Sequence, residues 1–128
     1  MPLKFHKETS GRGKTQNILW ILVGSSIALL IVYASITFEY PFKRAIISTP
    51  FGDALMHFFS YGLVMFSFCF PWKAMRTKII IGFVLFFLGI LLEAIQMYAW
   101  KSMRIEMNDI LGNTLGISVG YFLAGLKK

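Results

Sequence analysis

The chain has 128 residues, of which 56% are hydrophobic, and a formal net charge of +7. Its mean hydropathy is +0.65, and a soluble domain of this length could not bury so much apolar surface in one core, so most of the chain is expected to contact lipid. The basic residues stand in short stretches between apolar runs. That arrangement indicates membrane topology and contact with anionic head groups, and it argues against nucleic-acid binding.

The first seventeen residues form a polar tail, which we expect to be cytoplasmic and flexible up to the membrane. The apolar run Ile18–Phe38 follows, and about 20 helical residues at ~1.5 Å each cross a bilayer. A signal peptide is the competing interpretation, because basic residues precede the run and Val32-Tyr33-Ala34 resembles a cleavage site. The run is longer than the usual ~7–15 residues and no soluble mature domain follows, so we expect a retained span.

Three more apolar runs follow, separated by short linkers, and Pro71 ends the second run. No repeat or low-complexity tract indicates a second domain. Residues 18–126 are therefore expected to form one domain, an all-α integral membrane protein built as a bundle of four transmembrane helices. The expected spans are residues 18–38, 54–70, 79–100 and 110–126.

The distribution of Lys and Arg predicts the orientation of this bundle. The polar tail, the second linker and the C-terminus together hold nine of the 13 Lys and Arg residues, and the other two linkers hold four. Because cationic segments stay in the cytoplasm, both termini are expected inside. A multi-pass protein of a bacterial plasma (inner) membrane is the predicted location.

Polar side chains recur at helical spacing inside three of the spans, where such groups are costly unless they pair, face water or have a function. With the predicted topology, all of them lie near the outer surface, which indicates one external site. The predicted site residues are Asp53, His57, Tyr61, Glu93, Gln96, Arg104, Asp109 and Asn113.

Each of these residues also has a purely structural explanation. Asp53 and Asp109 could cap helix N-termini, and His57 could be a neutral core residue with one hydrogen bond. Tyr61 could be a packing aromatic, and Gln96 could join two helices. Arg104, in the outer loop, could be an ordinary surface charge or a counter-ion and phosphate clamp above Glu93 and Asp109. Glu93 is hardest to explain by packing, because a carboxylate at this depth needs a cation, a hydrogen-bond donor or a raised pKa.

Small residues recur every four positions in the last span, at Gly112, Gly116 and Gly120. A smooth helix face lets a neighbouring helix approach closely. This face is expected to press Asp109 and Asn113 against the second or the third span. Gly82 and Gly89 in the third span are a candidate surface to receive it.

The polar motifs occur in a defined order over residues 52–120, which is more than half of the chain. They read Asp53-x3-His57-x3-Tyr61, Glu93-x2-Gln96 and Arg104-x4-Asp109-x3-Asn113-x2-Gly116-x3-Gly120. This order resembles the VanZ-like family of small bacterial membrane proteins, whose founding member is linked to teicoplanin resistance. The chain departs from that pattern at Ala54, where relatives often have Lys, and over residues 105–108. The resemblance implies a four-helix membrane protein and no particular reaction.

The expected function is action on, or binding of, an envelope lipid or lipid-linked precursor at the outer leaflet, with an effect on glycopeptide susceptibility. His57, Glu93 and Asp109 are the candidate catalytic residues, since histidine suits acid–base work and a carboxylate can orient it. The candidate substrate-binding residues are Asp53, Tyr61, Gln96, Arg104 and Asn113.

Whether a reaction is catalysed stays open. The alternative is a non-enzymatic binding or assembly protein whose polar network is structural, and a transporter is a third interpretation. No cofactor is expected and no metal ligands are assigned, although a divalent metal held by His57 and two carboxylates stays an alternative. Membrane lipids or a lipid-linked envelope precursor are the expected partners, a homo-oligomer stays open, and nucleic acid is not expected.

Overall fold

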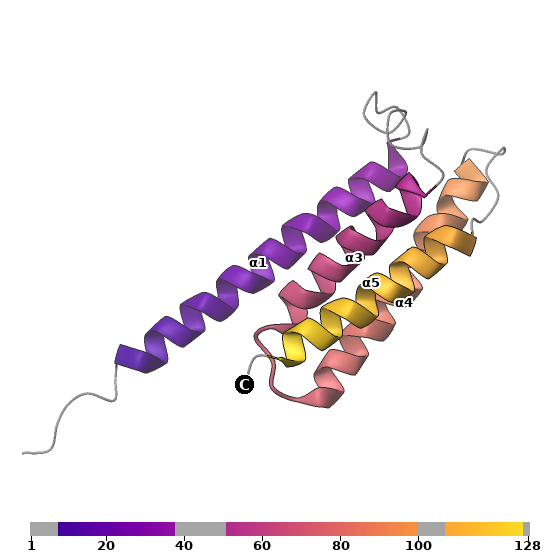
Figure 1. Cartoon of the computed structure of the whole chain (residues 1–128). Coiled ribbons are helices and arrows are strands. Elements are labelled where there is room, and N and C mark those ends of the chain that lie inside the picture. The colour runs from indigo at the N-terminus through magenta and orange to yellow at the C-terminus, as the bar shows by residue number, and fades with distance from the viewer. Residues whose placement is uncertain (1–7, 38–50, 100–106, 127–128) are drawn as a thin grey trace, which may run out of the picture.

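The computed structural model describes residues 8–37, 51–99 and 107–126, and all regular structure within these ranges is α-helical (Figure 1). The helices that follow the first one lie together as a bundle, and the first helix lies along its side and extends past it at one end (Figure 1). The helices are α1 (Glu8–Ile36), α3 (Gly52–Cys69), α4 (Met75–Ala99) and α5 (Met107–Gly125).

Two of these helices have the length and composition of membrane spans. The segments Gly13–Ile36 and Met75–Tyr98 each contain 24 residues with high mean hydropathy. The other two, α3 and α5, have 18 and 19 residues and contain most of the polar site residues. Large apolar side chains on the outer faces are exposed, for example Leu29 at 70% and Phe59 at 67%. The fold is thus all-helical, with the apolar exterior that is typical of membrane helices.

Each of the four predicted spans lies on one of these helices, with shifted boundaries. α1 begins at Glu8, so residues 8–17 of the polar tail are helical. The prediction of a flexible tail up to the membrane is therefore wrong for these residues. α3 ends at Cys69 because Pro71 cannot continue the ladder, and the chain turns through a hydrogen bond from the Trp72 amide to the Cys69 carbonyl (3.1 Å). Arg104 and the predicted end of the third span, Trp100, lie outside the described residues.

The closest helix pair is α3 with α5, and glycine makes this approach possible. A methyl group added at Gly112 would lie 2.5 Å from the Ala54 carbonyl oxygen, and Gly116 and Gly120 likewise face backbone carbonyls of α3. The small face of α5 therefore packs on α3, the second predicted span. Gly82 of α4 does not receive this face, because its neighbours are the side chains of Met65 and Ile117.

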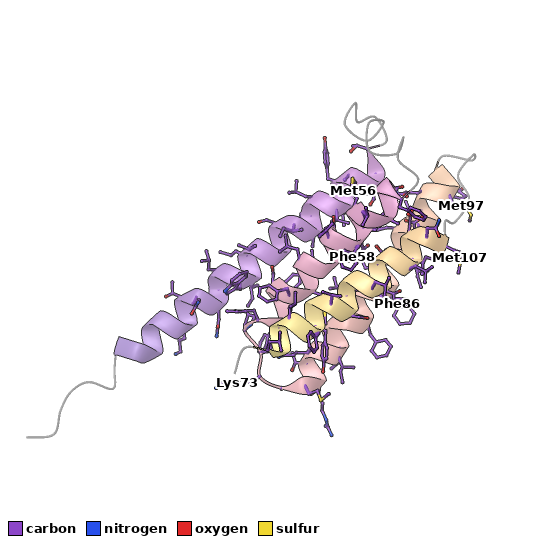
Figure 2. The ribbon with its side chains drawn as sticks, in the orientation of Figure 1. Met56, Phe58, Lys73, Phe86, Met97 and Met107 are labelled. Atoms are coloured by element: carbon purple, nitrogen blue, oxygen red, sulfur yellow. The ribbon has the colours of Figure 1, made fainter. Side chains whose placement is uncertain are left out.

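The remaining helices pack around this pair. α1 contacts α3 and α4, and Trp20 of α1 packs edge-on against Phe66 with ring centroids 5.5 Å apart. The buried core lies between α3, α4 and α5 and contains Tyr61, Val64, Met65, Cys69, Leu85 and Ala124. Figure 2 places Met97 and Met107 at one end of the bundle and Lys73 at the other. The start of α3, the end of α4 and the start of α5 thus share one end, where the polar motifs lie (Figure 1).

Candidate functional site

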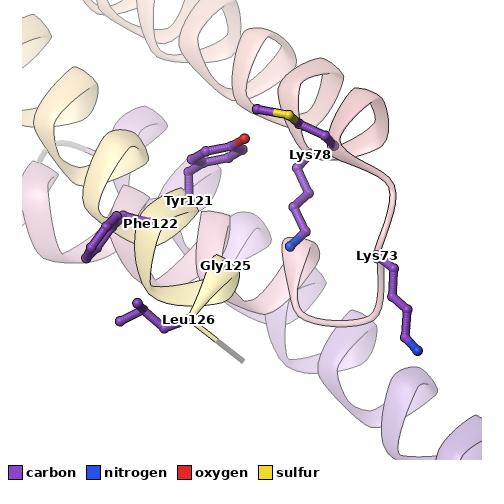
Figure 3. Close-up of a pocket in the computed structure, with 7 residues that line it drawn as sticks. Lys73, Lys78, Tyr121, Phe122, Gly125 and Leu126 are labelled. Carbon is purple, nitrogen blue, oxygen red and sulfur yellow. The ribbon is translucent and has the colours of Figure 1, made fainter. Parts of the chain in front are cut away.

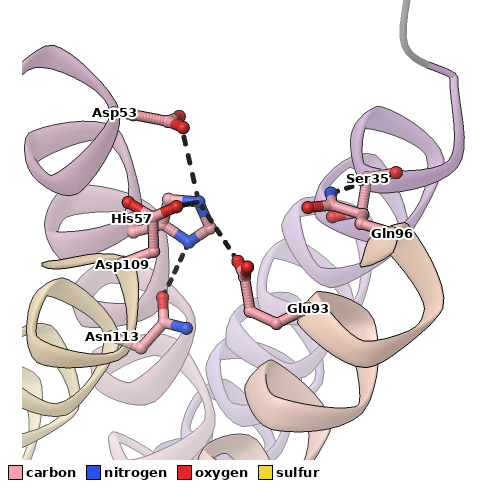
Figure 4. A network of polar contacts seen from close by, with 7 residues as sticks. All are labelled: Ser35, Asp53, His57, Glu93, Gln96, Asp109 and Asn113. Carbon is pink, nitrogen blue, oxygen red and sulfur yellow. Dashed lines mark hydrogen bonds and ion pairs between the residues drawn. The ribbon is translucent and has the colours of Figure 1, made fainter. Parts of the chain in front are cut away.

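His57 of α3 lies at the centre of a polar cluster to which three helices contribute (Figure 4). Its Nε2 atom is 3.9 Å from Asp53 Oδ1 and 3.9 Å from Glu93 Oε1 of α4. It is also 3.8 Å from Asp109 Oδ2 of α5. These separations are too long for hydrogen bonds, so the carboxylates act on the imidazole through charge. The predicted convergence of Asp53, His57, Glu93 and Asp109 is present in the fold.

The other ring nitrogen of His57 is held by Asn113. The distance from His57 Nδ1 to Asn113 Oδ1 is 2.9 Å. An amide oxygen can only accept, so Nδ1 carries a proton and donates it to Asn113. In the neutral ring Nε2 then has a free lone pair, and it faces the three carboxylates. Asn113 thus determines which nitrogen is available for acid–base or ligand chemistry.

Burial in the cluster increases from Asp53 inward. The side chains of Asp53 and His57 are 25% and 18% exposed, whereas Glu93, Asp109 and Asn113 are buried. Charged groups are rarely buried without partners. The cluster is therefore open to the surroundings on the Asp53 side and closed on the Asn113 side.

Asp53 is not the N-cap residue of α3, although it lies in the first turn, where the helix dipole favours a negative charge. The N-cap of α3 is Phe51, which makes no side-chain capping hydrogen bond, and Asp53 lies one residue inside the helix. Its carboxylate is placed beside His57. Asp109 likewise lies in the first turn of α5, where the helix dipole favours a negative charge.

The structure separates Gln96 from the cluster. Its amide Nε2 donates to the Ser35 carbonyl oxygen of α1 at 3.0 Å, and Figure 4 shows this pair apart from His57. This contact matches the helix-joining alternative, and a role of Gln96 in substrate binding stays a prediction. Tyr61 is buried one turn below His57, with its ring stacked on the imidazole at a centroid distance of 6.2 Å.

Sequence reasoning named Gly89 as a possible helix-packing position and did not place it in the site. A methyl group added there would lie 2.8 Å from Asn113 Nδ2 and 3.3 Å from the Tyr61 hydroxyl. The bare backbone of α4 therefore lets Asn113 fit between α3 and α4. The available signal was spacing, because Gly89 precedes Glu93 by one helical turn.

The same atoms form a candidate cation site. Asp53, His57 and Asp109 each offer one ligand atom, and these three atoms lie within 4.8 Å of one another. One imidazole with carboxylate oxygens is a donor set that suits Mn²⁺ and related divalent ions. Asn113 would supply the outer contact that commonly orients a histidine ligand.

No protein-family model, curated protein or solved structure matches this chain. The resemblance to the VanZ-like family therefore depends on the motif residues and their spacing.

Proposed function

We propose that the chain is a four-span membrane protein of the VanZ-like type, in a bacterial plasma membrane with both termini cytoplasmic. Its His57 cluster would face the outer leaflet and act on an envelope lipid or a lipid-linked precursor. The observation that supports this most strongly is the convergence of three carboxylates, from three helices, on one nitrogen of His57. Packing alone gives no reason to gather such costly groups on the one imidazole within the described residues.

The charge of the cluster limits what it can bind. Three carboxylates repel a bare phosphate group, so a phosphorylated lipid must bring or meet a cation here. Arg104, predicted at this end of the bundle, is one source of positive charge. A divalent metal between Asp53, His57 and Asp109 is another, because such ions commonly bridge carboxylates and phosphate oxygens.

The residues have distinct roles in this proposal. His57 Nε2 would accept or deliver the proton, and Asn113 would keep the ring in the required tautomer. Glu93 and Asp109 would stabilise the imidazolium that forms when Nε2 takes a proton. Since neither serine nor cysteine belongs to the described cluster, a hydrolytic reaction would use a water molecule that His57 activates.

The proposal is tested with bacterial membranes that contain wild-type protein, His57→Ala or Glu93→Gln at matched amounts. We expect wild type to change the amount of a lipid-linked species in mass-spectrometric lipid profiles, and each variant to reduce that change by about 10²-fold. Teicoplanin susceptibility is measured in the same cells. Adding Mn²⁺ or EDTA to the same membranes tests the metal variant of the proposal. If a metal is required, Mn²⁺ should support the change in lipid amount and EDTA should remove it.

Thr114→Ala is the matched control, because the Thr114 hydroxyl is exposed and donates to the Ile110 carbonyl of its own helix (2.7 Å). This variant should behave as wild type. The competing structural function is supported by the contacts that join helices, His57 to Asn113 and Gln96 to Ser35. Lipid profiles and drug susceptibility that do not differ between wild type and both site variants would favour that alternative.

A further inference from the structure

A pocket lies at the end of the bundle that contains Lys73, opposite the end with the His57 cluster (Figures 2 and 3). It has a volume of about 280 Å³ and lies between the α3–α4 connection, the start of α4 and the end of α5. Lys78 and Tyr121 supply its polar groups, and Phe122 and Leu126 supply apolar walls. Lys73 also lines the pocket, with its ammonium group pointing away from the other lining residues (Figure 3). In Figure 3 the Lys78 and Tyr121 side chains lie across the pocket from each other.

This end of the bundle is cationic. Residues 54–92 and 110–128 contain no Asp or Glu, whereas Lys73, Arg76 and Lys78 stand close together in the chain. The N-terminus of α4 lies at the same pocket, because Met75 lines it, and the positive end of a helix dipole favours an anion there. An anionic group is therefore the ligand that the pocket favours.

Lys78 still has donors for such a ligand. Its ammonium group is 3.5 Å from the Ala124 carbonyl oxygen at the end of α5. An ammonium group has three N–H donors, and this contact occupies one of them. Lys78 is half-buried, so its charge is less screened than that of the exposed Arg76.

An apolar groove continues from the pocket along α4 and α5. It has a volume of about 420 Å³ and shares Lys78 and Tyr121 with the pocket. Beyond them its lining is largely apolar and includes Met65, Gly82, Phe83, Phe86 and Ile117. Gly82 leaves this part of the lining without a side chain, and a methyl group there would lie 3.3 Å from Met65 Cε.

We propose that pocket and groove together bind one anionic phospholipid, with its phosphate at Lys78 and an acyl chain in the groove. Free phosphate would leave the groove empty, and a zwitterionic lipid would bring a second cation to a cationic pocket. The predicted topology places this end in the cytoplasmic leaflet, where anionic lipids are abundant. The inference requires a membrane location, and it does not depend on any chemistry at His57.

The test is native mass spectrometry of the full chain in detergent, titrated with phosphatidylglycerol or with phosphatidylcholine of the same acyl chains. We expect wild type to prefer phosphatidylglycerol. Lys78→Gln should weaken phosphatidylglycerol binding about fivefold and Lys78→Arg should retain it, because one cation near an anionic head group contributes an effect of that size. Gly82→Leu should weaken both lipids by filling the groove.

Arg76→Gln is the matched control, because it removes one charge nearby from a residue that does not line the pocket. It should change binding less than twofold, and thermal unfolding of each variant shows that it is folded. Equal effects of Arg76→Gln and Lys78→Gln, or equal binding of both lipids by wild type, would overturn the proposal. Displacement of phosphatidylglycerol by an equal concentration of inorganic phosphate would also overturn it, because it would identify a simple anion site.

Discussion

His57 has two ring nitrogens with different surroundings, and this difference defines the site at the scale of a residue. Nδ1 is fixed by Asn113, and Nε2 faces three carboxylates. The spacing of Asp53, His57 and Tyr61 was readable from the sequence, because residues four apart share a helix face. The partner of Nδ1 could not be read from the sequence, because Asn113 is 56 positions away in the chain.

The orientation of Asn113 depends on the absence of a side chain at Gly89. A methyl group there would crowd Asn113 Nδ2, so we expect Gly89→Ala to weaken the hydrogen bond from His57 to Asn113. The measurement is ¹⁵N NMR of the imidazole in a His6→Gln background, where His57 is the only histidine. Wild type should show the proton on Nδ1, and Gly89→Ala should shift the population toward Nε2–H.

Gly82→Ala is the control for this substitution, since its added methyl group would meet the flexible end of Met65 and lie far from the imidazole. It should leave both ring-nitrogen resonances where they are. Unchanged resonances in Gly89→Ala would show that Gly89 does not position Asn113.

The α3–α5 pair holds the site together at the scale of the elements. His57 and Asn113 can bond across the two helices because the backbones approach closely at Gly112 and Gly116. The repeat of small residues predicted a close contact from the sequence. It left two candidate partners, and only the packing of α5 on α3 distinguishes between them.

We expect Gly116→Ala to separate these helices, because its methyl group would collide with the Phe58 carbonyl, which cannot move without the rest of α3. Overpacking of this kind costs about 1–3 kcal/mol. Thermal unfolding in detergent, followed by circular dichroism, measures the loss. Gly125→Ala on the same helix has no atom within 4 Å of the added group and should unfold as wild type. Equal stability of the two variants would contradict this account of the interface.

The whole molecule has two chemically different ends. One contains the carboxylates and His57, and the other contains Lys73, Arg76 and Lys78 without any described acidic neighbour. The cationic end should stay in the cytoplasm, which would place the His57 cluster outside. The apolar exterior between the two ends is the surface that lipid would cover.

Accessibility of single cysteines tests this orientation in a Cys69→Ala background, in which the one native, fully buried cysteine is removed. Asn108→Cys at the start of α5 should react with a membrane-impermeant maleimide in intact cells. Ala74→Cys, between α3 and α4, should react only after permeabilisation. Both positions are exposed, so burial does not confuse the comparison. The reverse labelling pattern would place the His57 cluster in the cytoplasm.

Local properties of the chain determined the helices and the residues of the polar cluster, because hydropathy and helical spacing act over a few turns of one segment. The sequence alone thus identified four helical segments, the end of α3 near Pro71, and the polar faces that carry His57, Glu93 and Asp109. Tertiary structure decided which helix receives the glycine face, that Gln96 bonds α1, and which nitrogen of His57 is free. These outcomes depend on how helices far apart in the chain are rotated about their axes, and a pattern within one helix contains no information about its neighbour's rotation.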